Sequence, residues 1–286
     1  MKNIFIALLI LMISLTGVAQ DSTNKWQLTA GINFTSVPTI IISGTDTTYQ
    51  GNLSVSPSLD FRSKGGFGFI YAPQFVAGGT HPGIFMHKIT IGLEQYDKPN
   101  FDIVADYSHF FFTGNSSIPA TPISNEIIFG STYKKWWFRP KLSAGLGFGT
   151  NKSVSPSTMA YDIELAAGVS HSFEWDFKTL NFNLSPSILA NAGTNEYFSF
   201  LGLSKYISHS KRFSKIIKNS HAKNSRVATS NSVQRISVNN IELNMESSLE
   251  KGSFTLRPSG SVFLPVSSAS GSGIDGYWEL TLTYGF

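Results

Sequence analysis

Charged side chains in segments where polar and apolar residues alternate are the groups best placed to do chemistry in this chain. Alternate residues of a strand point to one face, so these charges would share the interior of a closed sheet. There, opposite charges either pair in a salt-bridge network or line a channel and select ions, with the excess of acids favouring cations. The acids are Glu94, Asp102, Asp106, Asp162, Glu164, Glu242, Glu246 and Glu279, and the bases are Lys88, Arg139, Lys141 and Arg257.

One histidine–serine pair, His171-Ser172, is the nearest candidate for nucleophilic catalysis. A lipid-cleaving site needs a histidine, a serine nucleophile and an orienting polar group on one patch. Adjacent strand residues point to opposite faces, so His171 and Ser172 cannot bond within their own strand. The other histidines lack metal-ligand spacing, and the glycine-rich pieces do not open a helix after a strand. We therefore predict no catalytic residues, no metal site and no cofactor.

A long basic segment, residues 193–235, interrupts the alternating pattern. It holds eight basic residues against the single acid Glu196, which leaves the rest of the chain net acidic despite an overall charge of +4. Its apolar residues are loosely spaced as one face of a helix. We predict an outer loop that is solvated, folds into the mouth as a constriction, or binds lipopolysaccharide phosphates, and no nucleic-acid binding. The basic residues that would form the constriction or bind these phosphates are Lys205, Lys211, Arg212, Lys215 and Lys218.

Period-two alternation over most of the chain predicts an all-β fold. It is clearest from Trp26 to Phe34 and from Trp278 to Phe286. These first and last strands are expected to pair and close a barrel. Ten further strands make twelve, with ten or fourteen as alternatives, and they are expected near residues 51–61, 66–76, 84–96, 101–112, 125–133, 136–149, 158–174, 177–191, 236–250 and 253–266.

The connections between these strands alternate between short and long, as in an antiparallel up-and-down transmembrane barrel. Short turns are expected at 63–65, 97–100, 134–135, 176–177 and 251–252, and long loops at 37–50, 77–83, 113–124, 150–157, 192–235 and 267–276. By strand direction, several interior charges should lie at the short-turn end and neutralise one another. They are Asp102, Asp106, Arg139, Lys141 and Arg257.

A soluble two-sheet sandwich would show the same alternation, hiding its apolar face in a core. Three features favour a barrel with lipid outside: long strands, aromatic residues near strand ends, and a polar face of Gly, Ser, Thr and Asn instead of a charged surface.

Residues 1–19 have the features of a cleaved targeting signal: Lys2, an apolar stretch from Ile4 to Leu15, and small residues at 17–19. That stretch is too short for a spanning helix, which needs about 20 residues. Residues 20–286 are then expected to form a single domain. Because the chain has no cysteine, we expect neither a disulfide framework nor a lipid anchor on a cysteine at the cleavage point.

The signal ending Val18-Ala19-Gln20, the aromatic-edged strands and the terminal Tyr284-Gly285-Phe286 resemble Gram-negative outer-membrane β-barrel proteins. The resemblance implies an outer-membrane location and contact with outer-membrane lipid and lipopolysaccharide. It also implies that the barrel-assembly machinery reads the last strand, here Trp278, Leu280, Leu282, Tyr284 and Phe286. The preferred expectation for function is a narrow porin-like channel for ions or small hydrophilic solutes. The alternatives are a non-conducting surface barrel whose loops bind a partner or lipopolysaccharide, and an outer-membrane lipid-modifying enzyme.

Overall fold

The computed structural model describes residues 26–43, 46–79, 81–96, 98–114, 123–150, 159–194, 236–266 and 275–286. These residues form strands joined by turns and loops. The strands are β1 (Trp26–Ser43), β2 (Asp46–Ser63), β3 (Phe67–Val76), β4 (Gly83–Gln95), β5 (Phe101–Phe112), β6 (Asn125–Tyr133), β7 (Arg139–Thr150), β8 (Met159–Ser170), β9 (Phe173–Phe177), β10 (Leu180–Gly193), β11 (Ser237–Lys251), β12 (Phe254–Pro265) and β13 (Asp275–Gly285).

None of the described residues belongs to a helix long and apolar enough to cross a membrane.

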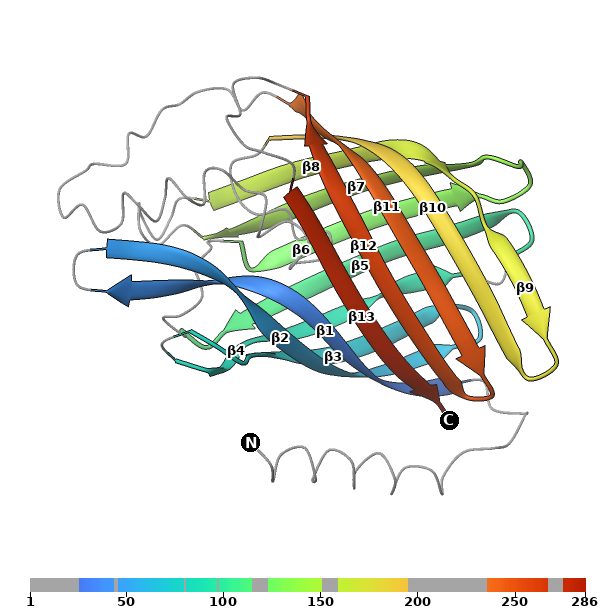
Figure 1. Ribbon diagram of the computed structural model, residues 1–286, viewed down its shortest axis with the longest axis horizontal. Coiled ribbons are helices and arrows are strands. Elements are labelled where there is room, and N and C mark those ends of the chain that lie inside the picture. The colour runs from blue at the N-terminus through green and yellow to red at the C-terminus, as the bar shows by residue number, and fades with distance from the viewer. Residues whose placement is uncertain are drawn as a thin grey trace.

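The strands form one closed antiparallel ring (Figure 1). Each strand pairs with the next along the chain, except that β8 pairs with β10 and not with β9. β13 returns to pair with β1, where Gly285 lies opposite Thr29 and Glu279 opposite Thr35. The amide of Phe286 extends this seam by donating to the carbonyl of Leu28 over 2.9 Å. The predicted closure by the first and last strands is confirmed. The sandwich alternative is wrong, because the described strands belong to a single sheet that closes on itself.

There are thirteen strands and not twelve because the strand predicted at 158–174 is interrupted and forms β8 and β9. β8 pairs with the second half of β10, from Ser187 to Gly193, whereas β9 pairs with its first half, from Leu180 to Leu184. His171 and Ser172 lie at the break between β8 and β9. The ring therefore has twelve positions, as predicted, but the turn expected at 176–177 lies at 178–179, since Phe177 still pairs with Leu180.

The β1–β2 hairpin corrects the long loop expected at 37–50. Both strands are 18 residues long, and the pairing continues as far as Ser43 opposite Asp46. Residues 37–42 and 47–49 are rich in Val, Ile, Thr and Tyr, which favour strands, so the pairing continues where a loop was expected. In Figure 1 the hairpin extends past the neighbouring strands. The strict alternation of short and long connections fails at this hairpin.

The other connections define two ends of the barrel. The short-turn end carries the turns at 64–66, 96–100, 134–138, 178–179 and 252–253, and the long-loop end carries the remaining connections. β1 begins and β13 finishes at the short-turn end, since Trp26 pairs with Ser63 beside the first short turn.

The two faces of the barrel differ in polarity. Within a strand, exposed apolar residues alternate with residues of lower exposure that are small, polar or charged. A surface of this kind suits hydrocarbon surroundings and not water. Representative exposed side chains are Phe61, Phe69, Ile91, Tyr107, Phe129, Leu146, Ile188, Leu243 and Trp278.

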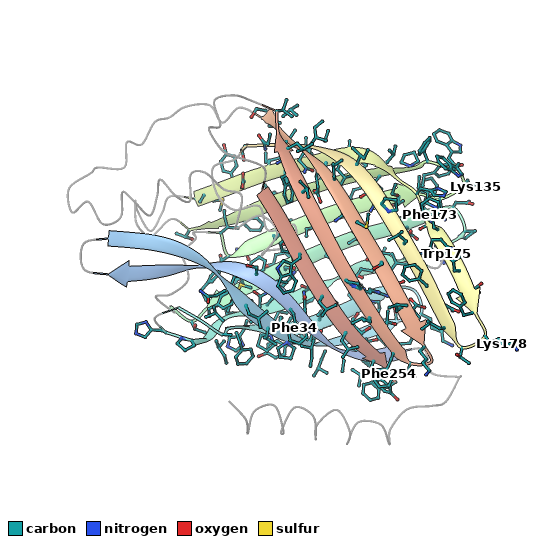
Figure 2. All side chains as sticks on the ribbon, viewed as in Figure 1. Phe34, Lys135, Phe173, Trp175, Lys178 and Phe254 are labelled. Atoms are coloured by element: carbon teal, nitrogen blue, oxygen red, sulfur yellow. The ribbon has the colours of Figure 1, made fainter. Side chains whose placement is uncertain are left out.

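Aromatic side chains are concentrated at the short-turn end. Phe173 and Trp175 of β9 are exposed, and Figure 2 places them with Lys135 and Lys178 at that end of the barrel. On β13, Tyr284 packs edge-on against Phe254 and Phe286, with ring centroids 4.6 Å and 4.8 Å apart. Aromatic side chains prefer the boundary between hydrocarbon and water, so this end matches one membrane interface.

Candidate functional site

Most of the predicted interior residues are buried or half-buried in the structure. Among them Asp162, Glu164 and Glu242 are buried, while Glu246 and Arg257 are exposed to the space inside the ring. The half-buried ones are Glu94, Asp102, Asp106, Arg139, Lys141 and Glu279. The structure divides them among several small networks.

The Arg62 cluster, made of Asp60, Arg62, Glu94 and Tyr96, lies at the short-turn end. Arg62 Nη2 lies 2.7 Å from Glu94 Oε1, and its Nε lies 3.3 Å from Asp60 Oδ2. Its Nη1 donates to the carbonyl of Gly66 over 2.8 Å. The rigid guanidinium fork therefore joins two carboxylates and a turn. Gly66 has a φ of 91°, and a Cβ there would meet the Glu94 carbonyl, so the turn requires glycine.

Tyr96 is held over the short-turn end by two contacts. Its hydroxyl donates to Glu94 Oε2 over 3.0 Å, and its carbonyl accepts from Lys134 Nζ over 2.8 Å. The same Lys134 ammonium lies 2.7 Å from Asp102 Oδ1. Arg139 pairs with Glu174 at 3.6 Å. Asp102 and Arg139 thus find partners in a turn and in β9, and not in each other.

Deeper along the same strands, two carboxylates are incompletely satisfied. Glu126 is only 2% exposed, and its Oε2, like Oδ1 of Asp106, is buried without a hydrogen-bond partner among the described residues. Gly92 makes room for Asp106, since a Cβ there would meet its carboxylate. Lys88 interacts electrostatically with both acids, although its Nζ lies over the Phe110 ring, 5.8 Å from the centroid.

The strands β10 to β13 hold carboxylates with neutral donors. Glu242, fully buried, accepts from Ser261 over 2.8 Å and from Asn191 over 3.2 Å. Asn244 in turn donates to Ser261 over 2.8 Å. On β8, Asp162 accepts from Thr194. These hydrogen bonds connect neighbouring strands through neutral donors, so no cation is needed as a partner.

Glu279 spans the seam of the barrel. Its Oε1 accepts from Asn33 of β1 over 2.7 Å and from Thr281 over 3.2 Å, and its Oε2 accepts from Tyr277 over 2.7 Å. Three donors on one carboxylate satisfy most of its acceptor capacity, so Glu279 has a structural role at the closure.

A cavity of about 530 Å³ opens at the short-turn end, between Tyr96 and the wall made by β10 to β13. Arg257 and Glu246 both line it. Among the described residues neither of these two charged groups has an ion pair or a hydrogen bond. Lys141, also predicted inside, has no ion pair among the described residues either.

Toward the long-loop end the interior of strands β3 to β6 becomes apolar. Phe85, Met86 and Phe110 are at most 2% exposed, as are Val76 and Ile123. Val76 and Phe110 are diagonal neighbours of Met86 in the register of β3, β4 and β5. We call these five side chains the apolar cap. Alternation did not reveal it. Val76, Met86 and Phe110 sit at inward positions where polar groups were expected, whereas Phe85 lies at the register shift between β3 and β4 and Ile123 precedes β6.

His171 and Ser172 do not form a catalytic pair. His171 Nδ1 bonds the carbonyl of Trp137 over 2.7 Å, and its ring packs between Trp137 and Phe173. Ser172 Oγ instead contacts Ser185 Oγ at 2.8 Å. Within the described part of the chain, no three metal-ligating side chains gather at one point.

Sequence reasoning missed Asp60, Arg62, Tyr96 and Glu126. The signal for Glu126 was present, since it precedes the outward-facing Ile127 in a strand predicted with correct bounds. Arg62 lay one residue beyond the expected strand, and Tyr96 lies in a turn whose direction alternation does not predict. The basic residues Lys205, Lys211, Arg212, Lys215 and Lys218, like the signal segment 1–19, lie outside the described residues.

No protein-family model matches the chain, and no curated protein matches its sequence. Among solved structures it is similar to the NanC porin, at 6% identity and a TM-score of 0.43 over 90% of this chain and 98% of that one. It is also similar to an outer-membrane channel from Pseudomonas putida F1, at 8% identity and a TM-score of 0.42 over 94% of this chain and 100% of that one.

Scores this low carry no argument, so the class follows from the chain's own architecture. Apart from the five-residue β9, its strands are long enough to cross a bilayer when tilted, which takes about 9–11 residues. One closed antiparallel ring, with an apolar outer face and a polar, charged interior, is the architecture of a Gram-negative outer-membrane β-barrel protein.

Proposed function

We propose that the chain is a narrow porin-like channel for ions or small hydrophilic solutes across the outer membrane. The incompletely satisfied carboxylates Asp106 and Glu126 carry this proposal. A carboxylate sealed from water without partners costs several kcal/mol. A cation that entered the interior would supply the missing partner, whereas a barrel packed shut by its own side chains would leave both oxygens without one.

Cations are the preferred ions in this proposal. Asp106 interacts electrostatically with Glu94 and Asp60 as well as with Arg62 and Lys88. Arg62 is already shared between Asp60 and Glu94, so the surplus charge of these strands is negative. Rings of acidic side chains are a common basis of cation selectivity.

Planar-bilayer recording of the refolded full chain tests the proposal. We expect single-channel steps and a reversal potential, in a KCl gradient, that indicates preference for K⁺. Glu126→Gln with Asp106→Asn should move that potential toward zero. The control is Asp176→Asn, an exposed carboxylate of β9, which should leave it unchanged. A refolded barrel without conductance, with and without residues 197–230, would contradict the proposal.

A non-conducting surface barrel is the second candidate, and the apolar cap favours it. Five buried apolar side chains at the long-loop end form a constriction of the kind that gates by excluding water. In this case the basic segment, with Lys205, Lys211, Arg212, Lys215 and Lys218, would bind lipopolysaccharide phosphates. Loss of lipopolysaccharide binding on deletion of 197–230, from a barrel that never conducts, would support this candidate.

A further inference from the structure

We infer that the cavity at the short-turn end binds small zwitterions whose ammonium and carboxylate groups sit on neighbouring carbon atoms, the class to which free amino acids belong. The inference deepens the proposed function and rests on it for its role, since the site would select solutes at one mouth of the channel. Binding itself is measured without conductance.

The cavity has the size and the polarity of a small-molecule site. Its volume of about 530 Å³ lies within the range of about 300–1,000 Å³ typical of ligand pockets. Its wall offers hydroxyl and amide groups, among them Asn183, Ser185 and Ser248, beside the two free charges. A ligand with several polar atoms would therefore find partners on most sides.

Two free charges of opposite sign lie on adjacent strands of this wall. Glu246 of β11 is opposite Ser259, and Arg257 precedes Ser259 by two residues on β12, so the two charges occupy diagonal positions. Diagonal neighbours in a sheet are about 7–8 Å apart at their Cα atoms. Among the described residues, Arg257 and Glu246 approach neither each other nor another charge within ion-pair distance.

This arrangement is complementary to a zwitterion. A guanidinium can bind a carboxylate through two parallel hydrogen bonds, and a carboxylate can accept from an ammonium group. A ligand with only one charge would leave the opposite member of the pair without a partner. The preference for zwitterions therefore comes from satisfying both charges at once.

The neighbouring acid Glu279 does not compete for Arg257. It is also diagonal to Arg257, since it pairs with Ser259 on the other side, yet Asn33, Tyr277 and Thr281 already donate to it. Those bonds fix the Glu279 carboxylate at the β1–β13 seam. Arg257 thus stays available to a ligand.

Tyr96 closes the cavity from the opposite side. It follows β4, across the ring from β12 in the strand order, and the Arg62 cluster and Lys134 hold it there. A bound ligand would therefore contact side chains from both sides of the barrel.

Isothermal titration calorimetry of the folded full chain in detergent micelles tests the inference with three probes. L-serine carries both charges, L-lactate only the carboxylate, and ethanolamine only the ammonium. We expect serine to bind at least tenfold more tightly than either single-charge probe. Arg257→Gln and Glu246→Gln should each weaken serine binding at least tenfold, whereas Lys251→Gln, an exposed residue on β11 outside the cavity, should not.

The outcomes separate this inference from the proposed channel. Equal binding of lactate and serine would reduce the site to an anion site and overturn the inference, and equal binding of ethanolamine would do the same for a cation site. No serine binding would overturn it as well. Conductance without serine binding would overturn only this inference. Serine binding without conductance would overturn the proposed channel and support the binding site.

Discussion

The interior of the barrel has two walls that treat their charges differently. On the first wall, β2 to β6, acids face bases: Arg62 binds Asp60 and Glu94, and Lys134 binds Asp102. On the second wall, β10 to β13, carboxylates are held by serine, asparagine, threonine and tyrosine, as at Glu242 and Glu279. The second wall consequently leaves its cation, Arg257, without a partner among the described residues.

This difference separates charges that stabilise the barrel from charges that are available to a solute. A carboxylate satisfied by neutral donors keeps its negative charge but needs no cation nearby. Arg257 of the second wall is thereby left for a ligand, whereas Arg62 and Lys134 of the first wall are paired within the fold. The following variants test that division, from the largest expected effect to the smallest.

Arg62→Ala should have the largest effect. It leaves Asp60 and Glu94 without their shared partner, and breaking a buried pair by removing one member costs about 3–5 kcal/mol. Because the Arg62 and Glu94 side chains keep 15% and 17% of their surface exposed, we expect a loss nearer about 2–3 kcal/mol in the free energy of unfolding, measured in urea by tryptophan fluorescence. Arg62→Lys, which keeps the charge without the fork, should lose about half as much. An unchanged unfolding midpoint in Arg62→Ala would show that the first wall does not depend on this cluster.

Glu242→Ala should have the next largest effect, because it removes the acceptor of two donors on the second wall. Ser261 and Asn191 would each keep a buried polar group with one partner fewer, at about 1–2 kcal/mol in total. Glu242→Gln removes only the charge and should cost less, under about 1 kcal/mol. The same urea experiment compares them. A loss larger than that of Arg62→Ala would reverse the proposed ranking of the two walls.

Tyr277→Phe should have a smaller effect at the seam. It removes one of three donors to Glu279, and Asn33 and Thr281 remain. A single hydrogen bond to a charged group contributes about 1 kcal/mol or somewhat more. The heat-induced mobility shift on a detergent gel follows barrel unfolding, and its midpoint temperature should fall slightly. A fall as large as that of Arg62→Ala would mean that closure at β1–β13 outweighs the first wall.

The smallest expected effect is the salt dependence of stability, which should differ between variants of the two walls. Between about 0.01 M and 1 M salt the screening length falls from about 30 Å to about 3 Å. The stability difference between wild type and Arg62→Ala should therefore shrink by a few tenths of a kcal/mol, while the difference for Glu242→Ala stays constant. Equal salt dependence in both variants would remove the distinction between ionic and neutral networks.

The barrel itself could be predicted from the sequence because side-chain direction along a strand is a local property with a period of two residues. The bounds of β5 and β6 were predicted to the residue, and the pairing of β1 with β13 followed from the need to leave no free edge. Where local signals are ambiguous the prediction failed, as in the β1–β2 hairpin, whose β-branched residues continue a strand through an expected loop.

Which charges meet was decided by the tertiary structure. Arg62 and Glu94 are 32 residues apart, and Asn33 and Glu279 are 246 apart, so their contact depends on the register and tilt of strands around the whole ring. The alternation of polar and apolar residues determined which faces of the strands turn inward. Only the closed ring decided that Arg62 would be shared, that Arg257 would have no partner among the described residues, and that Tyr96 would line the cavity opposite Arg257. Each of these depends on how far neighbouring strands are shifted along one another.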